Sequence, residues 1–352
     1  MLAEVPRQQE LTATRPDGPF RISWSLGTNP ELQSILGEAG ACEQNRLDGV
    51  WFPDYEEPLN GWPELYVTLS AIASKTRTVR LGSLITDVLR RNPAVTAHGF
   101  ASVSQVAPGR VVLGLGAGAG NSQVPFGISM EHSASKLDEG VRVIKALWEA
   151  RGSKADFSGR YFSLRSAQPP LFPLSPIPVY LASYGPKMLD LTAELADGWV
   201  PECHSPKTFR WTLDEILGKM RRFGRSPDSF HACCASIFYP WEPDEKAYSR
   251  LIQAAKGYLA NYPDIQSTAE CGGYHPAPRT RGSETSEDRI PDSLAEATLV
   301  CGNVSQCYER LIEMRDSGCA EAILEPYWIE KERIREGIEA AGKIKLWFAQ
   351  GH

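Results

Sequence analysis

Short apolar runs alternate with longer amphipathic segments along most of the chain. The runs are rich in Val, Ile, Leu and aromatic residues, which is typical of strands buried on both faces. Eight such strands are predicted, at 20–26, 48–53, 79–86, 111–117, 177–182, 199–201, 231–239 and 320–324. Helices are predicted at 29–45, 62–75, 93–106, 135–150, 187–196, 206–223, 244–261, 304–317 and 330–345. This alternation favours an α/β fold, a (β/α)8 TIM barrel with insertions, and leaves a doubly wound sheet as the alternative.

The segment 79–121 gives the clearest β-α-β pattern. Asn92-Pro93 is a helix start signal, and Pro108-Gly109 is a turn signal before the second strand. That strand ends in a run of glycines, where the backbone is expected to come close to another group. The run satisfies a loose dinucleotide-binding pattern, but Pro125 interrupts the helix that a Rossmann site requires. A glycine-lined strand end beneath a flat cofactor fits better, and a plain glycine turn is the alternative.

The composition shows no break that would divide the chain. We expect a flexible leader at 1–18 and one barrel domain at 19–348, with insertions at about 119–134, 152–175 and 262–292. The second insertion predicts a hairpin at 156–164. The third is polar and rich in Gly, Pro and Arg, which indicates a long loop that closes over a substrate.

Charge and cysteine content exclude several classes of protein. The chain has 352 residues, a net charge of −6 and no basic patch, so nucleic acid is not an expected partner. No apolar run reaches the roughly 18 residues of a membrane span. The eight cysteines form no CxxC pair, which favours reduced thiols in a cytoplasmic protein and argues against a metal site or a disulfide framework.

Polar residues follow several predicted strands, at the end where a barrel places its active site. Asp54 would serve as a hydrogen-bond acceptor or an acid-base group, or as a simple turn residue. Glu202 and His204 are candidates for proton transfer, although a surface histidine is the commoner outcome. The Arg90-Arg91 pair is expected to be solvated rather than bound to an anionic ligand.

Several longer segments together resemble the luciferase-like superfamily, and most closely its branch that uses coenzyme F420. The resemblance covers roughly residues 20–348 and lies in LDGVWFPDY, in LGSLITDVLRRNPAVTAHGFASVSQVAPGRVVLGLGAG, in PIPVYLASYGPKMLDLTAELADGWVPECHSPKTF and in HACCASIFY. It implies a TIM barrel, a homodimer and a hydride-transfer oxidoreductase acting on a small organic carbonyl, imine or alcohol. The same barrel with FMN would be a monooxygenase, and a non-catalytic flavin-binding barrel is a third possibility.

The resemblance also implies which residues bind the cofactor. Asp54 would contact the deazaflavin head, and Leu84-Ile85 would form a non-prolyl cis peptide behind the ring. The remaining cofactor-binding positions would be Thr86, Gly116, Gly118, Asn121, Ala182, Ser183, Tyr184 and Gly185.

The sequence departs from the family pattern in three respects. Tyr55 replaces a histidine, Ser23 and Ser25 stand where methylenetetrahydromethanopterin reductases have a glutamate, and Ala119 replaces the glutamate of the sugar-phosphate dehydrogenases. Neither methylenetetrahydromethanopterin nor glucose 6-phosphate is therefore implied as the substrate. Tyr55, Glu202 or His204 would donate or accept the proton that accompanies the hydride.

Overall fold

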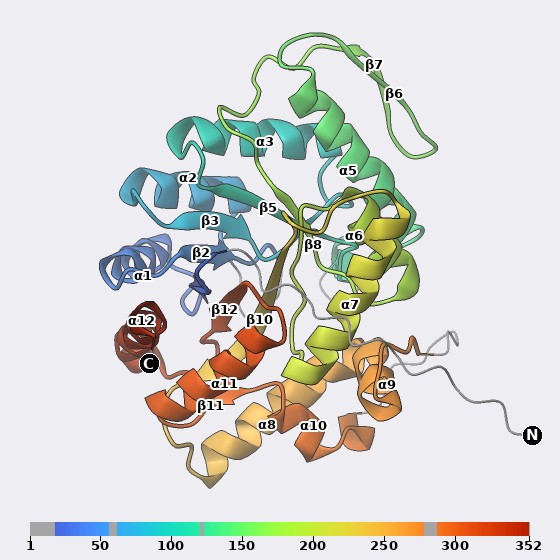
Figure 1. Cartoon of the computed structure of the whole chain (residues 1–352). Helices are drawn as coiled ribbons and strands as arrows, with labels where there is room; N and C mark the ends of the chain where they lie inside the picture. Colours follow the sequence, from blue (N-terminus) through green and yellow to red (C-terminus); the bar gives the residue numbers. More distant parts are fainter. Residues whose placement is uncertain (1–17, 56–61, 120–122, 278–286, 352) are drawn as a thin grey trace, which may run out of the picture.

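The computed structural model describes residues 18–55, 62–119, 123–277 and 287–351, and eight of its strands form a closed parallel barrel surrounded by helices (Figure 1). In chain order these strands are β1 (Arg21–Ser25), β2 (Gly49–Phe52), β3 (Arg80–Ser83), β5 (Val111–Gly116), β8 (Val179–Leu181), β9 (Gly198–Trp199), β10 (His231–Tyr239) and β12 (Glu321–Glu325). Each pairs in parallel with the next, and β12 pairs with β1. The predicted TIM barrel is confirmed. The doubly wound sheet is wrong, because it would leave two open edges.

The helices follow the predicted order. They are α1 (Leu32–Gln44), α2 (Leu65–Lys75), α3 (Pro93–Val106), α5 (Ser133–Glu149), α6 (Pro186–Leu195), α7 (Pro206–Arg222), α8 (Glu245–Asn261), α9 (Pro263–Cys271), α10 (Asp292–Glu296), α11 (Val304–Asp316) and α12 (Ile334–Gln350). The Asn92 side chain caps α3 by accepting from the backbone N–H of Ala94, with Pro93 in the first turn, so the start signal is confirmed. None of the described helices is long and apolar enough to cross a membrane.

The insertions contain more regular structure than their composition suggests. The predicted hairpin is present as β6 (Ala155–Ser158) and β7 (Ser163–Ala167), which project beyond α3 and α5 (Figure 1). The long loop predicted at 262–291 is wrong in its first part, because Pro263 starts helix α9. Residues 278–286 and the expected leader up to residue 17 lie outside the described part of the chain.

Two further short strands extend the sheet outside the barrel circuit. They are β4 (Thr86–Asp87), which pairs with β5, and β11 (Val300–Cys301), which pairs with β10. Short 3-10 helices occur at Val124–Phe126, Glu287–Arg289 and Lys331–Arg333.

The apolar core has an outer and an inner part. The outer part packs the strands against the helices, and the inner part fills the barrel. The inner part consists of Trp51, Leu84, Val112, Tyr180, Val200, Cys233, Ala235 and Ile323. On β12 the side chains of Glu321, Ile323 and Glu325 share one face, because successive residues of a strand point to opposite sides. The barrel interior therefore holds one glutamate on each side of its apolar layer.

Candidate active site

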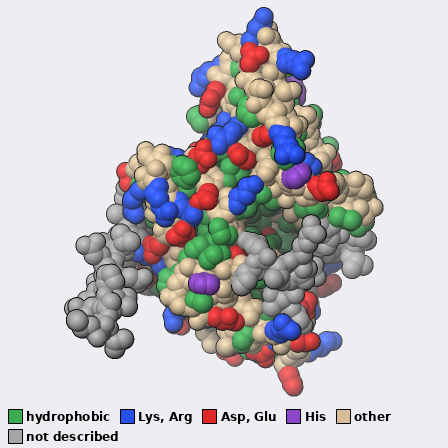
Figure 2. Space-filling view, turned by 90° about the vertical axis from the view of Figure 1, so that its right-hand side faces the viewer, with side chains coloured by type: hydrophobic (Ala, Val, Ile, Leu, Met, Phe, Trp, Pro, Cys, Tyr) green, Lys and Arg blue, Asp and Glu red, His purple; other side chains and the backbone are tan. Residues whose placement is uncertain are grey.

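A pocket of about 560 Å³ lies at the carboxyl ends of β4, β5 and β8. Figure 2 looks at a face of the molecule that is hollowed and carries hydrophobic side chains around the hollow. The pocket is lined by most of the predicted cofactor residues, namely Ile85, Thr86, Gly116, Gly118, Ala182, Ser183, Tyr184 and Gly185. Tyr55 also lines it. The structure thus brings together side chains from four separate β/α units, although Asn121 lies outside the described residues.

The floor of this pocket is apolar and depends on glycine. The Leu84–Ile85 peptide bond is cis, and Ile85 lies in the pocket while Leu84 packs inside the barrel. A Cβ atom added to Gly116 would lie 2.1 Å from Cδ1 of Ile85, which is closer than real Cβ contacts. Glycine at this position lets β5 lie against Ile85 without a shift of the Ile85 side chain.

Asp54 lies behind the pocket rather than on its surface. Its carboxylate accepts hydrogen bonds from Thr86 Oγ1 at 2.6 Å, from Arg91 Nη1 at 2.7 Å and from Arg90 Nη2 at 2.9 Å. The expected solvation of the arginine pair is wrong, because their side chains are only 6% and 16% exposed. These donors occupy the Asp54 carboxylate, so in this structure it fixes β4 and the turn that follows under the pocket.

The proton-transfer candidates Glu202 and His204 follow β9 and do not line the pocket. Glu202 is linked to the pocket wall in two ways: its N–H donates to Tyr184 Oη at 3.0 Å, and its Oε2 accepts from Tyr262 Oη at 3.5 Å. The Tyr184 and Tyr262 rings are stacked with 3.8 Å between their centroids. This stacked pair stands between the pocket and Glu202.

His204 is buried, so the expectation of a surface histidine is wrong. It is 2% exposed, and its ring packs edge-on against Trp199. Burial lowers its pKa to about 4, so the imidazole is neutral at physiological pH. Its Nδ1 lies 3.0 Å from the carbonyl oxygen of Glu202. This contact supports the backbone that carries Glu202.

Glu325 is a buried partner of Glu202 that the candidate set from the sequence did not include. It ends β12, is 1% exposed, and its Oε2 has no hydrogen-bond partner. Burial raises the pKa of Glu202 to about 7, and burial together with the charge of Glu202 raises the pKa of Glu325 well above its usual range. The sequence signal was an acidic residue that ends the apolar strand AILE.

Tyr55 keeps its proton at neutral pH. Burial, followed by the negative charge of Glu202, raises the pKa of this phenol well above its ordinary value. Of the sequence-predicted proton partners, it is the one that lines the pocket. It can therefore act as a hydrogen-bond donor toward a bound molecule.

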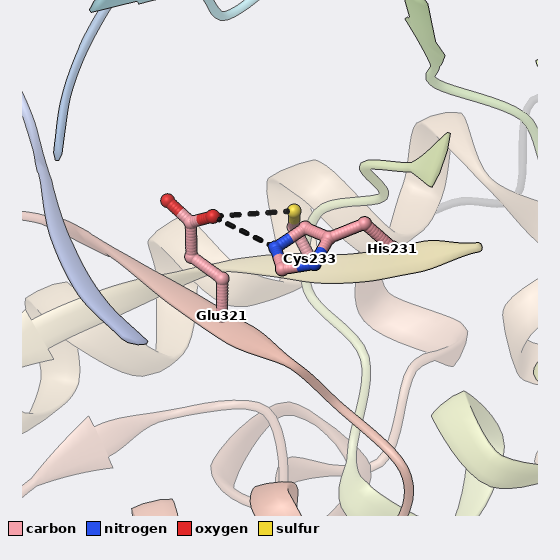
Figure 3. A group of neighbouring side chains, drawn as sticks. All are labelled: His231, Cys233 and Glu321. Carbon is pink, nitrogen blue, oxygen red and sulfur yellow. Dashed lines mark hydrogen bonds and ion pairs between the residues drawn. The ribbon is translucent and has the colours of Figure 1, made fainter. Parts of the chain in front are cut away.

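The opposite end of the barrel carries a second cluster, drawn in Figure 3. His231, Cys233 and Glu321 place their potential ligand atoms within 4.8 Å of one another. Arg80 also contacts Glu321, so a metal ion would have to displace a guanidinium. Burial opposes ionisation of Glu321, but Arg80 and His231 outweigh it and hold its pKa well below the usual range. We interpret this cluster as a structural ion-pair network.

Comparison with known proteins specifies the family to which this barrel and its pocket belong. Residues 18–321 match the model of the Luciferase-like monooxygenase family, and the chain belongs to this family. It is 27% identical over 305 residues to 5,10-methylenetetrahydromethanopterin reductase of Methanolobus tindarius, covering 84% of this chain and 90% of that one.

Two further relatives carry coenzyme F420 in their names. The chain is 34% identical over 212 residues to the F420-dependent glucose-6-phosphate dehydrogenase of Kineococcus radiotolerans, covering 58% of this chain and 62% of that one. Its fold is similar to that of an F420-dependent secondary alcohol dehydrogenase solved with an F420-acetone adduct, with a TM-score of 0.76, 20% identity, and 93% and 98% of the two chains covered.

The residues present fit a flat, phosphate-bearing cofactor. Ile85, Gly116 and Ala182 offer an apolar surface for a ring system. The pocket also includes Gly185 and Lys187 at the start of α6, where N–H groups and a positive charge favour an anion. Both coenzyme F420 and FMN meet this description, because each combines a tricyclic ring with a phosphate.

Proposed function

We propose that this chain is a coenzyme F420-dependent oxidoreductase that transfers a hydride between the deazaflavin C5 and a carbon of a small organic substrate. The observation that carries the proposal is the pocket with its glycine-dependent floor, formed at the positions that the resemblance implies for the cofactor. The names of the F420-dependent relatives support the deazaflavin over FMN. Catalysis would consist mainly of positioning the two reactants.

The residues of the pocket have distinct roles in this proposal. Ile85 and Gly116 would support the ring from below, and the start of α6 would hold the phosphate. Tyr55 would hydrogen-bond to the substrate and donate the proton that accompanies the hydride, since its phenol lines the pocket and stays protonated at neutral pH. The stacked Tyr184 and Tyr262 rings would shield the reacting atoms from water. When bound, the deazaflavin supplies the hydride carrier.

Cofactor binding is the direct test. Oxidised coenzyme F420 and FMN are each titrated into the purified protein, and binding is followed by fluorescence. We expect micromolar binding of coenzyme F420 and no comparable binding of FMN. Tight FMN binding without deazaflavin binding would contradict the proposal and favour a monooxygenase. A protein that binds coenzyme F420 but turns over none of a panel of carbonyl, imine and alcohol substrates would be a non-catalytic barrel.

A glycine substitution tests the pocket itself. Gly116→Ala places a methyl group 2.1 Å from the end of the Ile85 side chain, so this side chain, which lines the pocket, must shift. We expect the affinity for coenzyme F420 to fall by about tenfold or more, which corresponds to about 1.4 kcal/mol. Gly218→Ala on α7 is the matched control, because an added Cβ there meets nothing within 4 Å. Equal affinities of the two variants would argue against a cofactor on this floor.

A further inference from the structure

Most buried carboxylates of this protein are surrounded by hydrogen-bond donors. Glu38 accepts from Trp24 and Thr28, and Asp54 accepts from Thr86 and two arginines. Glu321 likewise accepts from Ser23, Trp51 and Arg80. Such donors offset the cost of removing a carboxylate from water. At each of these three buried carboxylates, two or more hydrogen-bond donors therefore offset the cost of burial.

The mouth of the barrel is the exception. Glu202 accepts one side-chain hydrogen bond, from Tyr262 at 3.5 Å, and Oε2 of Glu325 is buried without a partner. Within the described part of the chain, no lysine or arginine forms an ion pair with either carboxylate. The two acids interact with each other strongly enough that the charge of Glu202 raises the pKa of Glu325. Among the residues that the structure describes, Tyr262 is thus the side-chain donor to this pair, and no cation is paired with it.

Tyrosine rings lie near the pair, because the charges of Glu202 and Glu325 both act on the phenols of Tyr55, Tyr258, Tyr262 and Tyr327. A continuous series of ring contacts runs through Tyr55, Trp62, Tyr327, Trp328 and Tyr258, with centroid separations of 5.9 to 6.2 Å. These side chains and Glu202 are half-buried, whereas Glu325 is 1% exposed. Tyr55 also lines the cofactor pocket, which places the pair beside it. Carboxylates within a wall of aromatic rings form a surrounding that attracts organic cations.

We propose that Glu202 and Glu325, within this aromatic wall, bind a positively charged amine group of the substrate. An ammonium group supplies what the mouth lacks, namely N–H donors for the carboxylate oxygens and a charge that the rings attract. This inference rests on the proposed function only in assigning the bound amine as the substrate. It narrows that substrate to small organic molecules that carry a protonated nitrogen.

The binding of a cation here must depend on pH. The other titratable groups facing the pair are Tyr55, Tyr184, Tyr258, Tyr262, Tyr327, Cys203 and Cys234, and burial raises the pKa of every one of them. They stay neutral near pH 7, as does His204, whose pKa is lowered. Glu202, whose pKa burial raises to about 7, is then the member of the pair that loses its proton in this range, and Glu38, whose charge acts on Tyr327, also has a pKa raised to about 7 by burial. Affinity for a cation should rise with pH as Glu202 ionises.

The test compares two probes of the same shape. Benzylammonium and benzyl alcohol are titrated by calorimetry into the full chain, with and without saturating coenzyme F420. Near pH 8 we expect the ammonium to bind about tenfold more tightly than the alcohol. Lowering the pH to 6 should reduce ammonium binding and leave alcohol binding unchanged, since the amine itself remains charged throughout.

Variants assign the effect to the pair. Glu202→Gln and Glu325→Gln keep the shape of the side chain and remove its charge, so each should lose most of the preference for the ammonium. Glu309→Gln removes an exposed charge on α11 and should keep that preference. Unfolding temperatures establish that the variants are folded. If a variant does not fold, the pH dependence of ammonium binding by the unsubstituted protein still tests the proposal.

Three results would overturn the proposal: equal binding of the two probes, binding that weakens as the pH rises, or a preference that survives both substitutions. If the pair instead stores a proton for the substrate, hydride transfer would decline with rising pH while ammonium binding stayed weak. Ammonium binding without any binding of coenzyme F420 would support this site and overturn the proposed function. The two conclusions therefore fail separately.

Discussion

At the amino end of β12, Glu321 accepts hydrogen bonds from Ser23, Trp51 and Arg80, whereas at the carboxyl end of the same strand Glu325 has a buried oxygen with no partner. Both side chains point into the barrel and both are almost fully buried. At the amino end the surrounding charges lower the pKa of the acid, and at the mouth burial raises it. A buried carboxylate that is surrounded by hydrogen-bond donors contributes to the stability of the fold. A buried carboxylate without such donors lowers stability and leaves its oxygens available to a ligand.

The largest expected effect comes from removing the charge at the compensated end. Glu321→Gln leaves Arg80, whose side chain is only 18% exposed, without its charged partner, and breaking a buried pair in this way typically costs about 3–5 kcal/mol. Chemical denaturation near pH 7 measures the change in the free energy of unfolding. A loss below about 1 kcal/mol would show that this network is not a major source of stability. Exposed Glu309→Gln serves as the control.

A smaller loss is expected when one donor to the same carboxylate is removed. Ser23 Oγ donates to Glu321 Oε1 at 2.5 Å, and the residue is fully buried. Hydrogen bonds to charged groups contribute about 1.5–3 kcal/mol, so Ser23→Ala should lower the free energy of unfolding by that amount. In the Glu321→Gln background the same substitution should cost less, because the charge is absent. Additive losses in a double-mutant cycle would contradict this coupling.

At the mouth of the barrel we expect a smaller effect, in which the free energy of unfolding falls as the pH rises. The pKa of Glu202 is raised from 4.5 to about 7, so the folded chain retains a proton that the unfolded chain releases. Stability from this group is present below about pH 4.5 and is lost as the pH rises toward 7. Glu202→Gln should therefore flatten the decline in unfolding free energy between pH 5 and pH 8. An unchanged decline would show that Glu202 is not the responsible group.

The sequence predicted the β/α order well because that information is local. Apolar runs marked all eight barrel strands, and the helix between the third and fourth began at Pro93 as its start signal indicated. The composition of the third insertion was misleading, since a polar segment rich in Gly and Pro contained helix α9. The hairpin prediction was confirmed because alternation over a short turn needs no distant partner.

The sequence indicated where the residues of the site lie better than it indicated which other residues they contact. The resemblance implied that Ile85, Gly116, Tyr184 and Asp54 bind the cofactor. The structure places the first three on one pocket, and it pairs Asp54 with two arginines. Arg90 pairs with Asp87 three residues earlier, but both arginines also pair with Asp54, which lies more than thirty residues earlier in the chain. No local pattern indicates that second contact.

The sequence by itself determined where strands and helices begin, the glycine-rich strand end and the family. Hydrophobic period, caps and turn residues act within a few positions of one another, so they can be read along the chain. Only the tertiary structure decided that β12 closes the barrel against β1, which places Glu321 beside Arg80 and Glu325 near Glu202. Burial and the distance between charges determine whether such an acid stabilises the fold or remains available to a ligand, and both arise only when the barrel closes.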